Sequence, residues 1–170
     1  MTGIGDAPRR GPISELPAHG LATERVLLDP DGSTRRMLIG WDWASETHDV
    51  TVLDETGARV ARWAPTHTED GLARTLARLR GYGDPAGSPV AIESTRGLVV
   101  DRLLAAGHPV VPIHPNAFHA VRPRWGAAKA KTDAGDSFKL ADYLRTDGHT
   151  LRRIEPTDQA TLDVQALTRT

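Results

Sequence analysis

Met37-Leu-Ile-Gly-Trp-Asp42 is an apolar run that ends in an acid, and the fold can be worked out from it. It predicts a buried strand, and the alternating residues Asp49-Val-Thr-Val-Leu-Asp54 predict a second one. The turn Asp54-Glu-Thr-Gly57 leads to a third predicted strand over residues 58–64. Three strands joined by short connections indicate an antiparallel meander.

Downstream of the meander, helices and strands alternate. Thr68 is a suitable N-cap for a helix with leucines at positions 72, 76 and 79 on one face. The last predicted strand, Pro109–Ile113, contains two prolines, and these indicate that it lies at an edge of the sheet. The remaining expected elements are a strand at Pro89–Glu93, a helix at Gly97–Ala106, that edge strand at Pro109–Ile113, a short helix within residues 115–132, a helix at Asp133–Arg145 with Phe138, Leu140, Ala141 and Leu144 facing inward, and a last helix over residues 158–170.

This order of elements predicts an α/β fold of the ribonuclease H-like type, with a mixed sheet, a three-strand meander and flanking helices. The same order also begins actin-like ATPase and sugar-kinase domains, so that alternative stays open at this point. Residues 1–36 are rich in Gly, Pro and Arg and are expected to form a flexible leader before a domain at 37–156. Residues 157–170 are expected to begin a helix that the chain cuts short.

Composition excludes several classes of protein. The 170 residues contain no cysteine, which excludes disulfides, thiolate zinc sites and cysteine nucleophiles. The net charge of −1 requires any nucleic-acid contact to be local. There is neither a secretory signal nor an apolar run that could span a bilayer, so we expect a cytoplasmic protein without a membrane partner.

Four acids stand where strands or helices are expected to end or begin. Asp42 and Glu93 follow apolar strands, and Asp133 and Asp136 lie three residues apart at a predicted helix start. If the helix packs on the first strand, four carboxylates meet, and such a group can bind Mg²⁺ or Mn²⁺ and cleave phosphodiesters. Each acid also has an ordinary interpretation, as the end of a strand, a helix cap or a partner of the helix dipole.

Other polar residues carry weaker signals. His48 could line the site, but a polar turn residue is the expected role, and Asp142 and Asp147 are expected to be solvated. One cluster combines basic and aromatic side chains and could bind a phosphate backbone and stack on a base, although such loops are more often simply solvated. Its members are Arg122, Arg124, Trp125, Lys129 and Lys131.

Five short motifs together resemble a known family. They are Gly40-Trp-Asp-Trp-Ala with His48-Asp-Val, Ala91-Ile-Glu-Ser-Thr, Val111-Pro-Ile-His-Pro-Asn, Lys131-Thr-Asp-Ala-Gly-Asp, and Leu140-Ala-Asp-Tyr-Leu-Arg-Thr-Asp-Gly-His. From about Met37 to the end, the chain is similar to the N-terminal domain of DEDD-type insertion-sequence transposases. This is the "one-ten" family, which includes the Piv-type recombinases.

The resemblance implies a RuvC-like domain that binds magnesium through Asp42, Glu93, Asp133 and Asp136 and cuts and rejoins DNA in transposition. It also implies a homo-oligomer on DNA, an element-encoded guide RNA and a second, C-terminal domain with a nucleophilic serine, to which no part of this chain corresponds. The chain is therefore expected to be incomplete alone. Two other hypotheses are a non-catalytic nucleic-acid-binding remnant and half of an actin-like phosphotransferase.

Three positions depart from the family pattern. Arg96 and Leu98 follow the second acid where Thr-Gly and an aromatic residue are usual, and Ser137 replaces the usual Ala after the last acid. These departures concern loop geometry and substrate fit more than metal binding.

Overall fold

A computed structural model describes residues 30–33, 35–126 and 135–157. Within them, five strands form one sheet in the order β3-β2-β1-β4-β5. The strands are β1 (Leu38–Asp42), β2 (Asp49–Leu53), β3 (Arg59–Trp63), β4 (Val90–Ile92) and β5 (Val110–Pro112).

The sheet is mixed, as the sequence predicts. β1 pairs antiparallel with β2, which pairs antiparallel with β3, and these three form the meander. On its other side β1 pairs parallel with β4, and β4 pairs parallel with β5. The strand with two prolines therefore lies at an edge, and the α/β, ribonuclease H-like prediction is confirmed.

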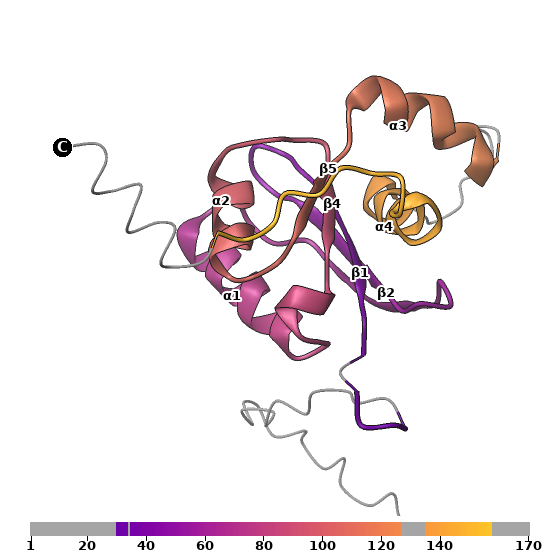
Figure 1. The fold of residues 1–170 in the computed structure, drawn as a ribbon. Coiled ribbons are helices and arrows are strands. Elements are labelled where there is room, and N and C mark those ends of the chain that lie inside the picture. Colours follow the sequence, from indigo (N-terminus) through magenta and orange to yellow (C-terminus); the bar gives the residue numbers. More distant parts are fainter. Residues whose placement is uncertain (1–29, 34, 127–134, 158–170) are drawn as a thin grey trace, which may run out of the picture.

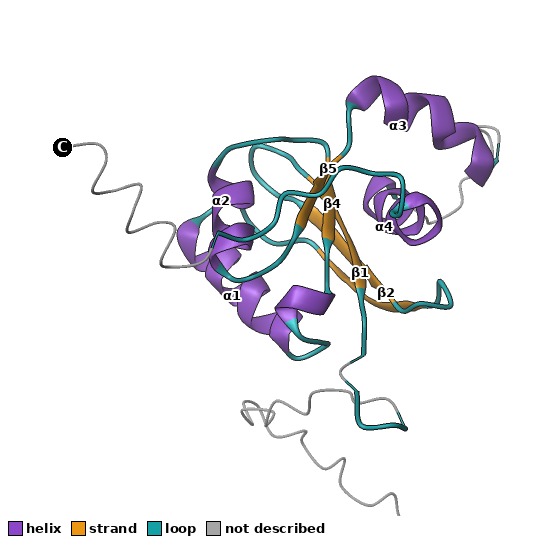
Figure 2. Ribbon diagram, viewed as in Figure 1, coloured by secondary structure: helices purple, strands orange, loops and turns teal. Residues whose placement is uncertain are grey.

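Helices cover both faces of this sheet (Figures 1 and 2). α1 (Glu69–Arg80) and α2 (Leu98–Ala105) lie on one face, and α4 (Asp136–Asp147) crosses the other with α3 (Pro115–Val121) beside it. Each layer has its own apolar core, one around Trp41, Leu72 and Leu103 and the other around Phe118 and Leu140. The described residues also include two short 3₁₀ helices, η1 (Pro85–Gly87) and η2 (Arg122–Trp125).

The first helix begins where the sequence predicts. The Thr68 hydroxyl accepts a hydrogen bond of 3.0 Å from the backbone N–H of Gly71, which caps the helix. Leu72 and Leu79 are fully buried, and Leu76 packs at the border of the same core. In α2, by contrast, the first residue, Leu98, is 38% exposed.

A glycine in β1 brings the backbone of α4 onto the sheet. A Cβ at Gly40 would lie 1.8 Å from the carbonyl oxygen of Ser137 and 2.6 Å from the amide nitrogen of Ala141. No side chain fits there, so only glycine permits this approach. The contact fixes the start of α4 relative to the end of β1.

The helix predicted over Asp133–Arg145 begins later in the structure. Gly135 is the N-cap, with extended backbone at φ −62° and ψ 173°, and Asp136 is the first helical residue. The described helix therefore starts at Asp136, three residues later than the sequence predicts. Asp133 lies outside the described residues, as do 1–29 of the predicted leader and the predicted helix at 158–170. Among the described residues no helix has the length and apolarity to cross a membrane.

Candidate active site

Three of the four predicted acids lie at ends of elements in the described part of the chain. Asp42 ends β1, Glu93 directly follows β4, and Asp136 begins α4. Because Trp41 pairs with Ile92 in the parallel β1–β4 register, the next residues, Asp42 and Glu93, leave the sheet at the same edge. The Gly40 contact brings Asp136 toward that edge.

The charges of these acids influence one another. Partial burial raises the pKa of Asp42, and the carboxylates of Asp136 and Asp49 raise it further, while Arg122 lowers it. Burial also raises the pKa of Glu93; Arg122 opposes this effect, and the charges of Asp42 and Asp136 add to it. Negative charges from three separate elements therefore act on one another in this region.

Side-chain cations already pair with one of these acids. Arg122 forms an ion pair with Asp136, and the Lys139 ammonium lies 3.3 Å from the other carboxylate oxygen. The Arg122 guanidinium also lies over the Phe118 ring, 4.9 Å from its centroid. Within the described residues, no three acids or histidines are arranged to hold a metal ion. The pairing of Asp136 with Arg122 and Lys139 gives one physical reason for this.

A fifth acid, which sequence reasoning did not assign to the site, lies beside Asp42. Asp49 is opposite Asp42 in the antiparallel β1–β2 register. It accepts hydrogen bonds from Nε and Nη2 of Arg62, at 3.0 and 2.9 Å. The Ser137 hydroxyl donates to it at 2.8 Å and lies 2.7 Å from the Thr51 hydroxyl. Because an ionised carboxylate only accepts, Ser137 receives its own hydrogen bond from Thr51.

This network explains the departure at Ser137. Its side chain is fully buried, and Thr51 is also inaccessible to solvent. The two hydroxyls join α4 to β2 directly behind Asp136. The signal in the sequence is the period of two in β2, which places Asp49 and Thr51 on one face of the strand.

His48 is not the polar turn residue that the sequence suggested. Only 1% of it is exposed, because it packs against Trp41 and His67. Its Nδ1 accepts a hydrogen bond of 3.2 Å from the Ala44 amide, and its Nε2 lies 2.9 Å from Nδ1 of His67. Burial, with a smaller effect of His67, lowers the pKa of His48 to about 4.

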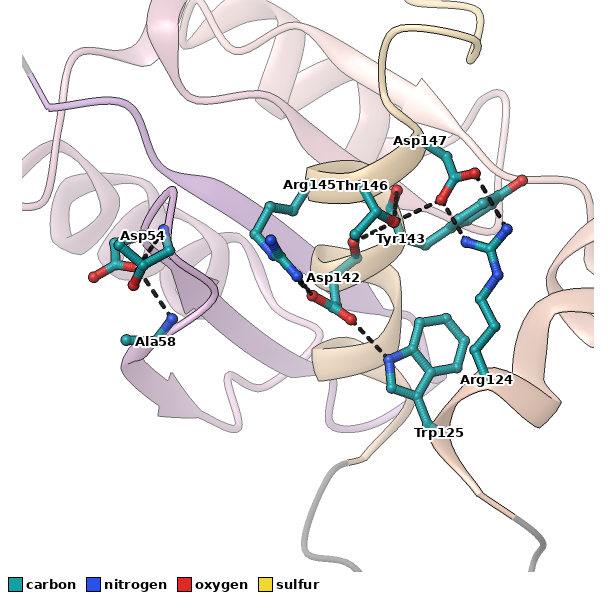
Figure 3. A network of polar contacts seen from close by, with 10 residues as sticks. Asp54, Ala58, Arg124, Trp125, Asp142, Tyr143, Arg145, Thr146 and Asp147 are labelled. Atoms are coloured by element: carbon teal, nitrogen blue, oxygen red, sulfur yellow. Dashed lines mark hydrogen bonds and ion pairs between the residues drawn. The ribbon is translucent and has the colours of Figure 1, made fainter.

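The predicted basic-aromatic cluster is held against α4 by acids (Figure 3). Arg124 pairs with Asp147, and the Trp125 indole donates a hydrogen bond of 2.9 Å to Asp142. The expectation that Asp142 and Asp147 are simply solvated is therefore wrong, since both bind η2 to the helix. Of the other expected nucleic-acid ligands, Arg122 pairs with Asp136, and Lys129 and Lys131 lie outside the described residues.

Comparison with known proteins assigns this arrangement to a family. Residues 39–170 match the family model for the DEDD transposases of IS110 elements, described as "Transposase". The chain is 36% identical over 132 residues to the "Mini-circle putative transposase for IS117" of Streptomyces coelicolor, covering 76% of this chain and 32% of that protein. It is 33% identical over 176 residues to the "Putative transposase y4uE" of Sinorhizobium fredii, covering 96% of this chain and 49% of the relative. The chain thus spans half or less of the length of these relatives.

Proposed function

Because this chain belongs to the DEDD transposases of the IS110 family, we propose that Asp42, Glu93 and Asp136, together with Asp133, form a metal-dependent site for DNA strand cleavage and exchange. The observation that carries the proposal is the placement of Asp42 and Glu93 at neighbouring strand ends and of Asp136 at a helix start, where the charges of the three acids act on one another. A structural role alone gives no reason to bring three like charges together at one edge of a sheet.

The donor set suits Mg²⁺ or Mn²⁺, which prefer carboxylate oxygens. When bound, such ions activate an attacking oxygen and stabilise the leaving oxygen of a phosphodiester. Asp42 and Glu93 are held by the sheet, so the chain presents them in fixed positions. Asp136 would have to leave Arg122 and Lys139 in order to hold an ion, because both cations pair with its carboxylate in the structure. The two released cations would then be free to contact a substrate phosphate.

The test uses Asp42→Asn in the 170-residue chain, with Asp101→Asn, a change of an exposed acid on α2, as the control. Mg²⁺ or Mn²⁺ should raise the melting temperature of the wild type and of the control, since an ion that binds only the folded state stabilises it. It should leave Asp42→Asn unchanged. Metal-dependent nicking of supercoiled DNA should follow the same pattern. Equal metal stabilisation of all three proteins would refute the assignment.

The other features are proposed from family membership. The DNA-bound form is a homo-oligomer guided by an element-encoded RNA, it acts in the bacterial cytoplasm, and complete recombination needs a further domain with a nucleophilic serine. The segment from Arg122 to Lys131 contacts nucleic acid once its arginines leave their acid partners.

A second candidate is a non-catalytic nucleic-acid-binding module. It is favoured by one observation, the neutralisation of Asp136 by Arg122 and Lys139. It predicts DNA or RNA binding by this chain that is equal in EDTA and in Mg²⁺, together with no nicking of DNA by the chain in Mg²⁺. The main proposal predicts tighter binding of DNA in Mg²⁺.

A further inference from the structure

Glu93 also lines a cavity that none of the roles above uses. Its volume is about 440 Å³, within the range of pockets that take small organic groups. Ile92, Val99 and Val100 give it an apolar lining, and Arg96 contributes a cation. The cavity therefore combines apolar and charged groups next to one of the proposed catalytic acids.

An exposed aromatic ring forms part of the same cavity. Trp43 follows Asp42 by one residue and is 53% exposed, whereas Trp41, on the other side of the acid, is fully buried. The Trp43 ring centroid lies 6.2 Å from that of His67 in an edge-to-face arrangement, and 6.5 Å from that of His48. Contacts with two histidines restrict the orientation of the indole, so a ligand loses little additional side-chain entropy when it stacks there.

The hydrogen bond between His48 and His67 has a defined direction. The Ala44 N–H donates to Nδ1 of His48, so this nitrogen carries no proton. The proton of neutral His48 is then on Nε2, which donates to Nδ1 of His67. In neutral His67 the proton is on Nε2, and His67 itself lines the cavity. The two hydrogen bonds therefore leave Nε2–H of His67, a residue of the cavity lining, as the next donor.

We propose that this cavity binds an unpaired nucleobase of the DNA strand whose phosphate lies at Asp42 and Glu93, with the base stacked on Trp43 and its edge bonded to His67 Nε2–H. This inference rests on the proposed function for the identity of the strand. A base offers the flat π-face that an indole binds and the acceptor atoms that an N–H group requires.

The position of the cavity favours a nucleotide over a peptide. Glu93 belongs both to the acidic site and to the cavity lining, so a strand that places one phosphate at the acids brings an adjacent nucleotide to the cavity. Arg96, three residues further along the loop, can pair with a neighbouring phosphate. The Ser94 hydroxyl donates to the Arg96 carbonyl at 2.7 Å and shapes this loop.

The experiment compares the binding of the 170-residue chain to three DNA duplexes by fluorescence anisotropy. One duplex has a single unpaired nucleotide, the second has an abasic residue at the same place, and the third is fully paired. The unpaired base should bind about 5- to 150-fold more tightly than the abasic residue, the range that stacking of one base on an aromatic ring supports. Trp43→Ala should abolish this ratio, Trp43→Phe should keep most of it, and His67→Ala should reduce it.

Circular dichroism melting controls for folding, and Trp43→Ala should melt close to the wild type because the side chain is half exposed. Equal affinity for the unpaired and abasic duplexes would overturn the proposal, as would a ratio that survives in Trp43→Ala. It is also overturned if the Trp43 indole resonance depends on protein concentration without DNA, since a second copy then covers the ring. The readout is a ratio of affinities and needs no cleavage, so it can succeed or fail independently of the Asp42→Asn test.

Discussion

Replacement of Ser137 by alanine tests whether the buried hydroxyls behind Asp136 stabilise the fold. The change removes a hydrogen bond to ionised Asp49 at 2.8 Å and one with Thr51 at 2.7 Å. It opens almost no space, because alanine differs from serine only by the hydroxyl. Asp49 keeps two hydrogen bonds from Arg62, but the Thr51 hydroxyl loses Ser137, the partner seen in the structure, at a position without solvent.

The cost should be that of a buried polar group left without its partner, about 1–3 kcal/mol. For a domain of this size the melting temperature should fall by about 4 °C for each kcal/mol. The double variant Ser137→Ala/Thr51→Val removes both hydroxyls and should recover part of the loss, since no buried donor then remains unpaired.

Urea denaturation of the wild type, both single variants and the double variant gives the coupling free energy directly. We expect the losses of the single variants to exceed, in sum, that of the double variant by at least about 0.5 kcal/mol. A Ser137→Ala variant as stable as the wild type, or strictly additive effects, would contradict the network as described.

Three further changes have defined outcomes. Gly40→Ala should cost about 3 kcal/mol or more, because its Cβ overlaps backbone atoms of α4, whereas Gly87→Ala meets no atom within 4 Å and should be neutral; chemical denaturation compares the two. His48 is neutral in the folded state down to a pKa of about 4 but binds a proton near pH 6.5 when unfolded, so stability falls as pH drops through this window, by at most about 3 kcal/mol. Between pH 7 and pH 4, the melting temperature of His48→Asn should depend less on pH than that of the wild type. His119→Gln, a change of an exposed histidine, is the control and should keep the wild-type pH dependence. The same pH dependence in all three proteins would exclude His48 as the source of the effect. Arg122→Gln removes the cation that opposes the raised pKa values of the acids, so Mg²⁺ affinity, followed by thermal shift, should rise on the order of tenfold, and unchanged affinity would mean that Asp136 does not exchange partners.

The sequence predicts the sheet and the strand-end acids because both follow from local pattern. Apolar runs and alternation locate the strands, and the order of elements places Asp42 beside Glu93 at one edge. Helix starts are less well determined by pattern. The start of α4 depends on the extended backbone of Gly135, where a Cβ would lie 2.7 Å from an Arg62 nitrogen and 2.9 Å from a carboxylate oxygen of Asp49. Those neighbours are distant in sequence, so spacing alone could not reveal them.

His48 and Asp142 differ from the sequence prediction for the same physical reason. His48 is buried because His67, nineteen residues away, accepts its hydrogen bond, and the isolated bridge between Thr47 and Thr66 brings the two loop segments together there. Asp142 is bound by Trp125, seventeen residues before it. A charged or polar side chain considered without its tertiary partner is expected in solvent, and only the fold supplies the partner.

Helix α4 serves both the core and the proposed site, and this determines which variants are informative. Ser137 and Leu140 bury its inner face, while Asp136 at its first turn belongs to the acids. Loss of activity after a change in α4 is therefore ambiguous, because misplacement of the helix gives the same result. Asp42 is different: its pKa is raised, so above its ordinary pKa its charge destabilises the folded state, and neutralisation by Asp42→Asn should not weaken the fold. If Asp42→Asn melts no lower than the wild type but is no longer stabilised by Mg²⁺, the loss is one of metal binding and not of folding. A change at the end of β1 can therefore separate the two effects, whereas a change in α4 cannot.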